Sequence, residues 1–401
     1  MEVKETVKKI ISRVKSTGDK ALFYYSKKYD GVDLPSLRVS RSEIKRAYQK
    51  IDTRLVSVLK RATKNIYKFH STQFVLPKRK TETEKGVQVW REFRAVERVG
   101  LYAPGGKAAY PSTVLMLGIP AKIAGCPEII LCSPPDKNGR LNPAVLVAAD
   151  LVGIKKIYKV GGAQAIAALA YGTKTIPRVL KIFGPGNQFV TAAKLLLYGQ
   201  VDIDMPAGPS EIMILADQSA VPKWVAADLL SQLEHGPDSQ AVLVTPSRRL
   251  ANEVFFEVKK QAKPLNRRAV IDQSLKNSCI LVVDTLGTAY KVINEYAPEH
   301  LEIIIGDEVS ALRSIKNAGS VFLGPYSSEP LGDYATGANH TLPTAGYAKT
   351  FSALSVEAFG KTMQVQKVSK KGMAGLRKTV ETLASTEGLD AHKKAVELRF
   401  E

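Results

Sequence analysis

Residues 128–172 read EIILCSPPDKNGRLNPAVLVAADLVGIKKIYKVGGAQAIAALAYG. Two short apolar strands, EIILCSP and KIYKVGG, are each followed by a turn containing Gly or Pro and then by a helix-like stretch. Repeated strand–turn–helix units of this length predict a parallel sheet that is covered by helices on both faces and joined by right-handed crossovers.

The same texture extends outward from this stretch in two sets. The first set of strands comprises RVGLYAP, EIILCSP, KIYKVGG and VLKIFGP. The second set follows DIDMPAGPSE and comprises EIMILAD, QAVLVTP, CILVVD, LEIIIG and SVFLG. Roughly the first seventy residues have apolar positions at helical spacing, and after Leu342 the pattern loosens before a final helix.

The predicted fold class is therefore α/β, with two doubly wound, Rossmann-like parallel-sheet domains and a helical C-terminal appendage. We assign residues 1–101 and 211–345 to one domain, 102–210 to the second domain, and 346–401 to the appendage. Ligands of open parallel sheets bind beyond the carboxyl ends of the strands, so the junctions directly after each strand are expected to carry the site.

Charge and composition argue against several classes of protein. The 401-residue chain has a formal net charge of +20, but its Lys and Arg residues are spread along the sequence instead of forming the concentrated patch that nucleic-acid binding needs. No apolar run approaches the ~20 residues required to cross a bilayer. The charged N-terminus lacks the apolar core of a signal peptide, so a cytoplasmic protein is expected.

The three cysteines form no CxxC pair and cannot build a disulfide framework. Cys126 and Cys132 lie in or beside the apolar run EIILCS and are predicted to be buried structural thiols. A catalytic thiolate would need an electropositive, partly exposed setting, which the sequence around them does not indicate.

Two glycine turns are candidate nucleotide contacts. VGGAQAIA and FGPGNQFV each place glycine before a helix, although neither matches the GxGxxG fingerprint. Helix N-termini of this kind suit phosphate groups. Each turn is equally compatible with a tight strand–helix connection that binds nothing.

Four of the five histidines have a carboxylate within a few residues, in SQLEHGPDSQ, YAPEHLEI, GDYATGANHTLP and EGLDAHKK. His70, in NIYKFHSTQF, lacks such a neighbour and is predicted to be structural. The four suit either a metal centre or acid–base chemistry. Gln232 and His235 are three residues apart at a predicted helix end, so their side chains can face one point. Without further information Glu234 would be favoured over Gln232 as the ligand, because zinc binds carboxylates more often than amides.

These strings, together with LYAPGG, VGGAQAIAALAYG, IFGPGNQFVTAAK, DIDMPAGPSEI and AGSVFLG, resemble the histidinol dehydrogenase family. They occur in family order and span the chain from about residue 10 to residue 399. Long strings in fixed order are far more specific than any single short motif.

The resemblance implies an enzyme that uses two NAD molecules to oxidise L-histidinol to L-histidinaldehyde and then to L-histidine. His300 would take the alcohol proton, and Glu299 would activate the water that adds to the aldehyde. The zinc ligands carried over are Gln232, His235, Asp333 and His392. The positions that would hold substrate, with those ligands and His300, are Ser210, His340 and Glu387. The NAD-contacting positions are Tyr102, Gln164 and Asn187, which assigns the cofactor to the domain of residues 102–210.

The resemblance also implies a homodimer in which the C-terminal segment reaches the partner's site, so that Glu387 and His392 would complete it. Three alternatives stay open from the residues. A related zinc-dependent dehydrogenase could act on another alcohol, such as a sulfonate diol. A basic protein could bind nucleic acid, and a metal-binding protein could lack turnover altogether.

Overall fold

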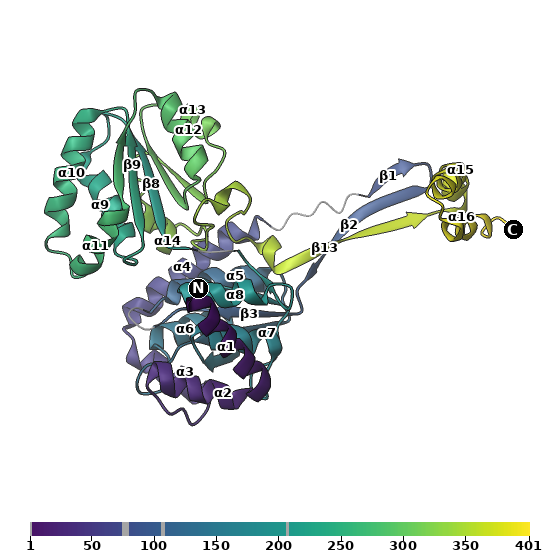
Figure 1. The fold of residues 1–401 in the computed structure, drawn as a ribbon, viewed down its shortest axis with the longest axis horizontal. Coiled ribbons are helices and arrows are strands. Elements are labelled where there is room, and N and C mark those ends of the chain that lie inside the picture. Colours follow the sequence, from purple (N-terminus) through teal and green to yellow (C-terminus); the bar gives the residue numbers. More distant parts are fainter. Residues whose placement is uncertain (1, 74–79, 106–108, 206–207) are drawn as a thin grey trace. The chain divides into compact units, whose positions relative to one another are not determined.

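The structure is a computed structural model that describes residues 2–73, 80–105, 109–205 and 208–401 (Figure 1). All nine predicted apolar strands are present, in two five-stranded parallel sheets with the orders β5-β4-β3-β6-β7 and β10-β9-β8-β11-β12. The predicted fold class is confirmed. Among the described residues, no helix is long and apolar enough to span a membrane.

The first sheet carries almost continuous apolar strands. Residues Ile130, Leu131 and Cys132 of one strand are all fully buried, as expected where helices cover both faces of a parallel sheet. The strands are β3 (Arg98–Tyr102), β4 (Glu128–Ser133), β5 (Lys156–Lys159), β6 (Lys181–Phe183) and β7 (Asp202–Ile203). Their helices are α5 (Pro111–Ile123), α6 (Pro143–Val152), α7 (Gly162–Tyr171) and α8 (Gln188–Leu197).

The N-terminal helices pack on this first sheet layer. Helix α1 contacts α7 and α8, α3 contacts α6, and α4 contacts α5 and α6 (Figure 1). The structure thus divides the chain differently from the predicted range 1–101, because the apolar faces of these helices bury themselves against the helices of residues 102–210. The helices are α1 (Glu2–Thr17), α2 (Asp19–Tyr25), the π-helix η1 (Ser26–Asp30), α3 (Arg41–Lys50) and α4 (Thr53–Ser71).

The second sheet lies within residues 211–323. Its strands are β8 (Glu211–Ala216), β9 (Gln240–Thr245), β10 (Cys279–Val282), β11 (His300–Ile304) and β12 (Ser320–Leu323). Its helices are α9 (Pro222–Leu233), α10 (Arg248–Ala262), α11 (Arg268–Ser274), α12 (Leu286–Tyr296), α13 (Glu308–Ser314) and α14 (Glu329–Tyr334). Three short helices are η2 (Leu275–Asn277), η3 (Tyr347–Lys349) and η4 (Val356–Phe359).

Residues 74–95 and 360–401 form a separate compact unit. It contains an antiparallel sheet of β1 (Thr81–Glu84), β2 (Val87–Ala95) and β13 (Gly360–Val368), followed by α15 (Lys370–Thr386) and α16 (Asp390–Glu397). The appendage predicted from the sequence comprised residues 346–401, whereas this unit combines residues 74–95 with 360–401. The two stretches join because β13 pairs with β2 along its whole length.

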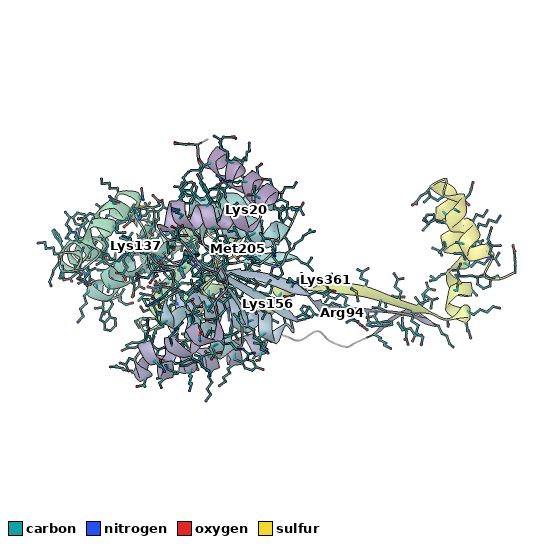
Figure 2. All side chains as sticks on the ribbon, turned by 90° about the horizontal axis from the view of Figure 1, so that it is seen from below. Lys20, Arg94, Lys137, Lys156, Met205 and Lys361 are labelled. Carbon is teal, nitrogen blue, oxygen red and sulfur yellow. The ribbon has the colours of Figure 1, made fainter. Side chains whose placement is uncertain are left out.

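Basic side chains occur on separate elements of both units. In Figure 2, Lys20 lies on α2 and Lys156 on β5, whereas Arg94 and Lys361 lie in the second unit. Arg94 and Lys361 are direct cross-strand partners on β2 and β13. Like charges directly opposite one another destabilise a strand pair.

Each parallel sheet has one topological switch point, where the direction of strand addition reverses. In the first sheet it lies between β3 and β6, and in the second between β8 and β11. Such points are the usual ligand crevices of open α/β sheets.

Candidate active site

The first candidate pair, Glu299 and His300, lies at the amino end of β11, beside the start of β8. Both residues are buried, with 6% and 4% of their surfaces exposed. From the sequence we expected the site beyond the carboxyl ends of the strands. In this sheet the candidate residues lie at the opposite edge, at the amino ends. The reason is that α14 brings Asp333 and Glu329 to the amino end, within 3.9 Å of His300.

The peptide groups of Glu211 hold both members of the pair. The backbone N–H of Glu211 donates to Oε2 of Glu299 at 2.8 Å. Its carbonyl oxygen lies 3.0 Å from Nδ1 of His300. A carbonyl oxygen only accepts, so in the neutral imidazole Nδ1 carries the proton and Nε2 keeps a lone pair. The imidazole of His300 can therefore accept a proton at Nε2.

Burial dominates the electrostatics of this pair. It lowers the pKa of His300 to about 4, against the opposing attraction of the Asp333 carboxylate. The pKa of Glu299 is raised well above its usual range by burial, and then by the nearby carboxylates of Glu211, Asp333 and Glu329. His300 is therefore a neutral base at pH 7.

A group of three side chains has the geometry of a metal-ligand cluster. One ligand atom from each of His235, Glu329 and Asp333 lies within 4.8 Å of the others. Gln232, three residues before His235, is fully buried, and neither its amide oxygen nor its amide nitrogen has a hydrogen-bond partner among the described residues. Glu234, which spacing alone favoured, is exposed just after α9.

His340 lies against the same carboxylate. Its Nδ1 is 3.2 Å from the carbonyl oxygen of Asp333 and 3.8 Å from the Asp333 carboxylate. Its Nε2 is 3.4 Å from the hydroxyl of Thr113 on α5. Ser210 is half-buried immediately before β8, so Ser210, His300 and His340 belong to elements that adjoin this edge.

His70 has the structural role that the sequence predicted. It is fully buried in α4, and its Nε2 lies 3.1 Å from the amide nitrogen of Asn339. The same Asn339 amide donates to the carbonyl of Met116 at 2.7 Å. Burial lowers the pKa of His70 to about 4. These contacts hold the backbone directly before His340.

Two predicted positions belong to the second unit. Glu387 follows α15 as its C-terminal cap, and His392 lies on α16. Both side chains are exposed. The cluster described above consists of residues of the first unit alone.

The predicted cofactor positions lie at the carboxyl ends of the first sheet. Tyr102 ends β3, and its hydroxyl accepts the backbone N–H of Gly162 at 3.0 Å. Gln164 is buried in the first turn of α7. Asn187 caps α8 by accepting from the N–H groups of Phe189 and Val190. Tyr102 and Asn187 therefore flank the switch point between β3 and β6.

A sequence profile described as histidinol dehydrogenase matches residues 1–400. The chain belongs to the histidinol dehydrogenase family. A histidinol dehydrogenase of Bacteroides fragilis is 52% identical over 398 residues, which cover 99% of this chain and 93% of that protein. A histidinol dehydrogenase of Methanocaldococcus jannaschii is 47% identical, over 100% of this chain and 93% of its own length.

The fold agrees with this membership. The crystal structure of histidinol dehydrogenase from Elizabethkingia anophelis superposes with a TM-score of 0.97 at 47% identity, covering 100% of this chain and 92% of that one. An acetylating aldehyde dehydrogenase from Geobacillus thermoglucosidasius, 12% identical with a TM-score of 0.51, shares only the fold.

The cysteines of this histidinol dehydrogenase family member are poor nucleophiles. Cys126 and Cys132 are buried, as predicted. Burial raises the pKa of the Cys126 thiol to about 11 and that of Cys132 further. Cys279 is exposed, and its thiol pKa is also raised. Since a thiolate is the reactive form, none of the three is prepared for covalent catalysis.

Sequence reasoning missed Glu329 of the cluster and two acidic residues near it, Glu302 and Asp228. Glu302 accepts the backbone N–H of Glu329 at 2.7 Å, and its carboxyl group adjoins that of Asp228. Burial and the neighbouring Asp333 carboxylate raise the pKa of Glu329 to about 8. One signal was present in YAPEHLEIIIG, because Glu302 interrupts an apolar strand on the same face as His300.

Proposed function

We propose that this protein oxidises L-histidinol to L-histidine in two NAD-linked steps through L-histidinaldehyde, on a substrate held by zinc. One observation carries the proposal: the neutral base His300 and the buried carboxyl group of Glu299 lie side by side at an edge that also holds His235, Glu329 and Asp333. Family membership favours histidinol over other alcohols. A cytoplasmic location is part of the proposal.

The residues present fit a zinc ion. Imidazole nitrogen and carboxylate oxygen are common zinc donors, and the unpartnered buried amide of Gln232 needs a polar partner. Gln232, His235 and Asp333 would hold the metal, with His392 of a second copy. When bound, zinc would hold the substrate's amine and imidazole nitrogens as a template, and NAD would accept the hydride.

In the first step, His300 takes the proton of the alcohol hydroxyl at Nε2. Burial keeps its imidazole neutral, and the Glu211 carbonyl fixes the tautomer that leaves Nε2 free. His340 and Ser210 orient the substrate from the neighbouring loops.

In the second step, Glu299 takes a proton from the water that adds to the aldehyde. Burial raises the pKa of Glu299, and the deprotonated form of such a group is a stronger base than an ordinary carboxylate. As the water adds, His300 returns its proton to the aldehyde oxygen and is neutral again. It then takes a hydroxyl proton of the hydrated aldehyde, and a second NAD would accept the hydride from the same carbon. No thiol is required, in agreement with the raised thiol pKa values of the cysteines.

The cofactor position is supported by the backbone of the first sheet. At Gly184, which directly follows β6, φ is +123° and a Cβ would lie 2.1 Å from the carbonyl oxygen of Tyr102. Glycine therefore allows two strand ends to meet closely at the switch point. NAD would bind there against Tyr102, Gln164 and Asn187.

The proposed assembly is a homodimer. Glu387 and His392 are exposed on the second unit, where a partner chain can reach them. Each copy would complete the other's site with these two residues, and a monomer would lack the fourth zinc ligand.

Glu299→Gln is expected to separate the two steps. The amide keeps an acceptor for the Glu211 N–H but cannot take a proton, so alcohol oxidation should persist while aldehyde oxidation falls by about 10²-fold or more. Product analysis in the presence of an aldehyde trap checks this, with about one NADH formed per histidinol. Equal losses in both half-reactions, each measured from its own substrate, would contradict the assigned division of roles.

A further inference from the structure

A buried ion pair lies beneath the glycine turn that follows β6. Lys194 on α8 and Asp204, just after β7, form a salt bridge, with 5% and 1% of their side chains exposed. Neither residue belongs to the zinc cluster or to the predicted cofactor contacts. The pair is therefore a charged feature that the proposed mechanism does not use.

The ion pair binds both polar groups of one residue. The backbone N–H of Gly184 donates to Oδ2 of Asp204 at 2.7 Å. The ammonium group of Lys194 donates to the carbonyl oxygen of Gly184 at 3.1 Å. Gly184 is thus held from two sides by opposite charges, on the chain segment that leads to Asn187.

The position of Gly184 is tightly constrained for a second reason. A Cβ there would lie 2.1 Å from the Tyr102 carbonyl, so this backbone lies directly against the end of β3. A small displacement of the turn would change the spacing between the ends of β3 and β6. That spacing defines the switch-point crevice.

Stability alone is a weak reason to keep such a pair. Removing two charges from water costs free energy that their attraction often does not recover, and apolar replacements are frequently neutral or stabilising. Because both members of this buried ion pair also hydrogen-bond to the backbone of Gly184, the position that they impose on that backbone is a better explanation of the pair.

We propose that Lys194 and Asp204 are positioning residues that fix the Gly184 turn for binding the dinucleotide. This inference rests on the proposed function, because it assumes that NAD binds at this switch point. It adds two residues, neither of which touches the cofactor, to the determinants of NAD affinity.

The test is the double variant Lys194→Met/Asp204→Asn in the full-length, zinc-loaded protein. It removes both charges together, so neither is left buried alone, and the introduced amide side chain still offers an acceptor to the N–H of Gly184. Calorimetric titration should show a rise of about tenfold in the Kd for NAD, equivalent to the loss of roughly one directed interaction. The KM for NAD should rise in parallel, while kcat at saturating NAD, zinc content and histidinol affinity stay within about twofold.

The matched control is Lys181→Met/Asp202→Asn. This pair joins β6 to β7 at 2.9 Å, and Asp202 is half exposed. The side-chain hydrogen bonds to Gly184 come from Asp204 and Lys194, not from this pair. Its NAD affinity should be that of the unaltered protein. A second version, Lys194→Gln/Asp204→Asn, is used if the first does not fold, as judged by circular dichroism.

The outcomes separate the two claims. If the unaltered protein does not bind NAD, the proposed function fails. If it binds NAD and the folded double variant binds equally well, the positioning role is overturned. If neither double variant folds, the pair serves the stability of the domain, which also overturns the inference.

Discussion

His300→Ala is expected to slow oxidation of the alcohol by about 10²- to 10⁴-fold, the usual contribution of a positioned general base. The imidazole is the neutral base at the amino end of β11, and its Nδ1 is already bound to the Glu211 carbonyl. Alanine leaves no group to take the hydroxyl proton. Stopped-flow measurement of NADH formation from L-histidinol checks the first half-reaction directly.

The pH dependence has a defined sign. Burial places the pKa of His300 at about 4, so the base form persists throughout the neutral range and is lost only as pH falls through that value. The first half-reaction should therefore not decline near pH 6.5, where an exposed histidine would titrate.

His300→Asn is the control for volume and should be as slow as His300→Ala, with zinc content unchanged. A variant with unaltered alcohol oxidation would show that another group is the base.

Asp333→Ala is expected to abolish metal binding and both half-reactions. One carboxylate oxygen of Asp333 lies 4.0 Å from Nε2 of His235, and the other lies 3.9 Å from Nε2 of His300. A single metal ion would bind both the Asp333 carboxylate and the His235 imidazole. Elemental analysis of the dialysed variant should find less than about a tenth of the zinc of the unaltered protein. Losing a residue that hydrogen-bonds to a metal ligand already lowers metal affinity by roughly 10- to 100-fold, and losing a ligand itself should lower it further.

Glu234→Gln is the matched control for this substitution. Glu234 is an exposed carboxylate next to His235, so its loss should leave zinc content and turnover unchanged. Full zinc occupancy in Asp333→Ala, or loss of zinc in Glu234→Gln, would contradict the ligand set.

Nine of the ten strands of the parallel sheets could be predicted, because each is a short apolar run followed by a turn. The tenth, β7, is only two residues long and has no such run. The strands of the second unit could not be predicted in this way. Strand β1 has the sequence TETE and is wholly exposed, and β13 is mostly exposed, so neither shows the apolar pattern that marks a buried strand. The pairing of β13 with β2 joins Gly360 to Ala95 and Val368 to Val87, and no local pattern predicts a pairing over that sequence separation.

The candidate site was predictable where its residues are neighbours in sequence. Glu299 and His300 are adjacent, and Gln232 and His235 lie one helical turn apart. The preference for Gln232 over Glu234 came from the family resemblance and stays a prediction. In the structure Gln232 is buried and Glu234 is exposed. Glu329 escaped notice because its contacts with His300 and His235 depend on the fold that brings α14 to β11.

The most direct test of the central claim is the stoichiometry of the reaction. Purified protein is supplied with a limiting amount of L-histidinol, excess NAD and zinc, and then again after chelation and with unrelated alcohols. We expect two NADH and one L-histidine per histidinol, with no NADH after chelation or with the other alcohols. A folded, zinc-containing dimer that forms no NADH from L-histidinol would contradict the proposed substrate and point to a relative acting on a different alcohol.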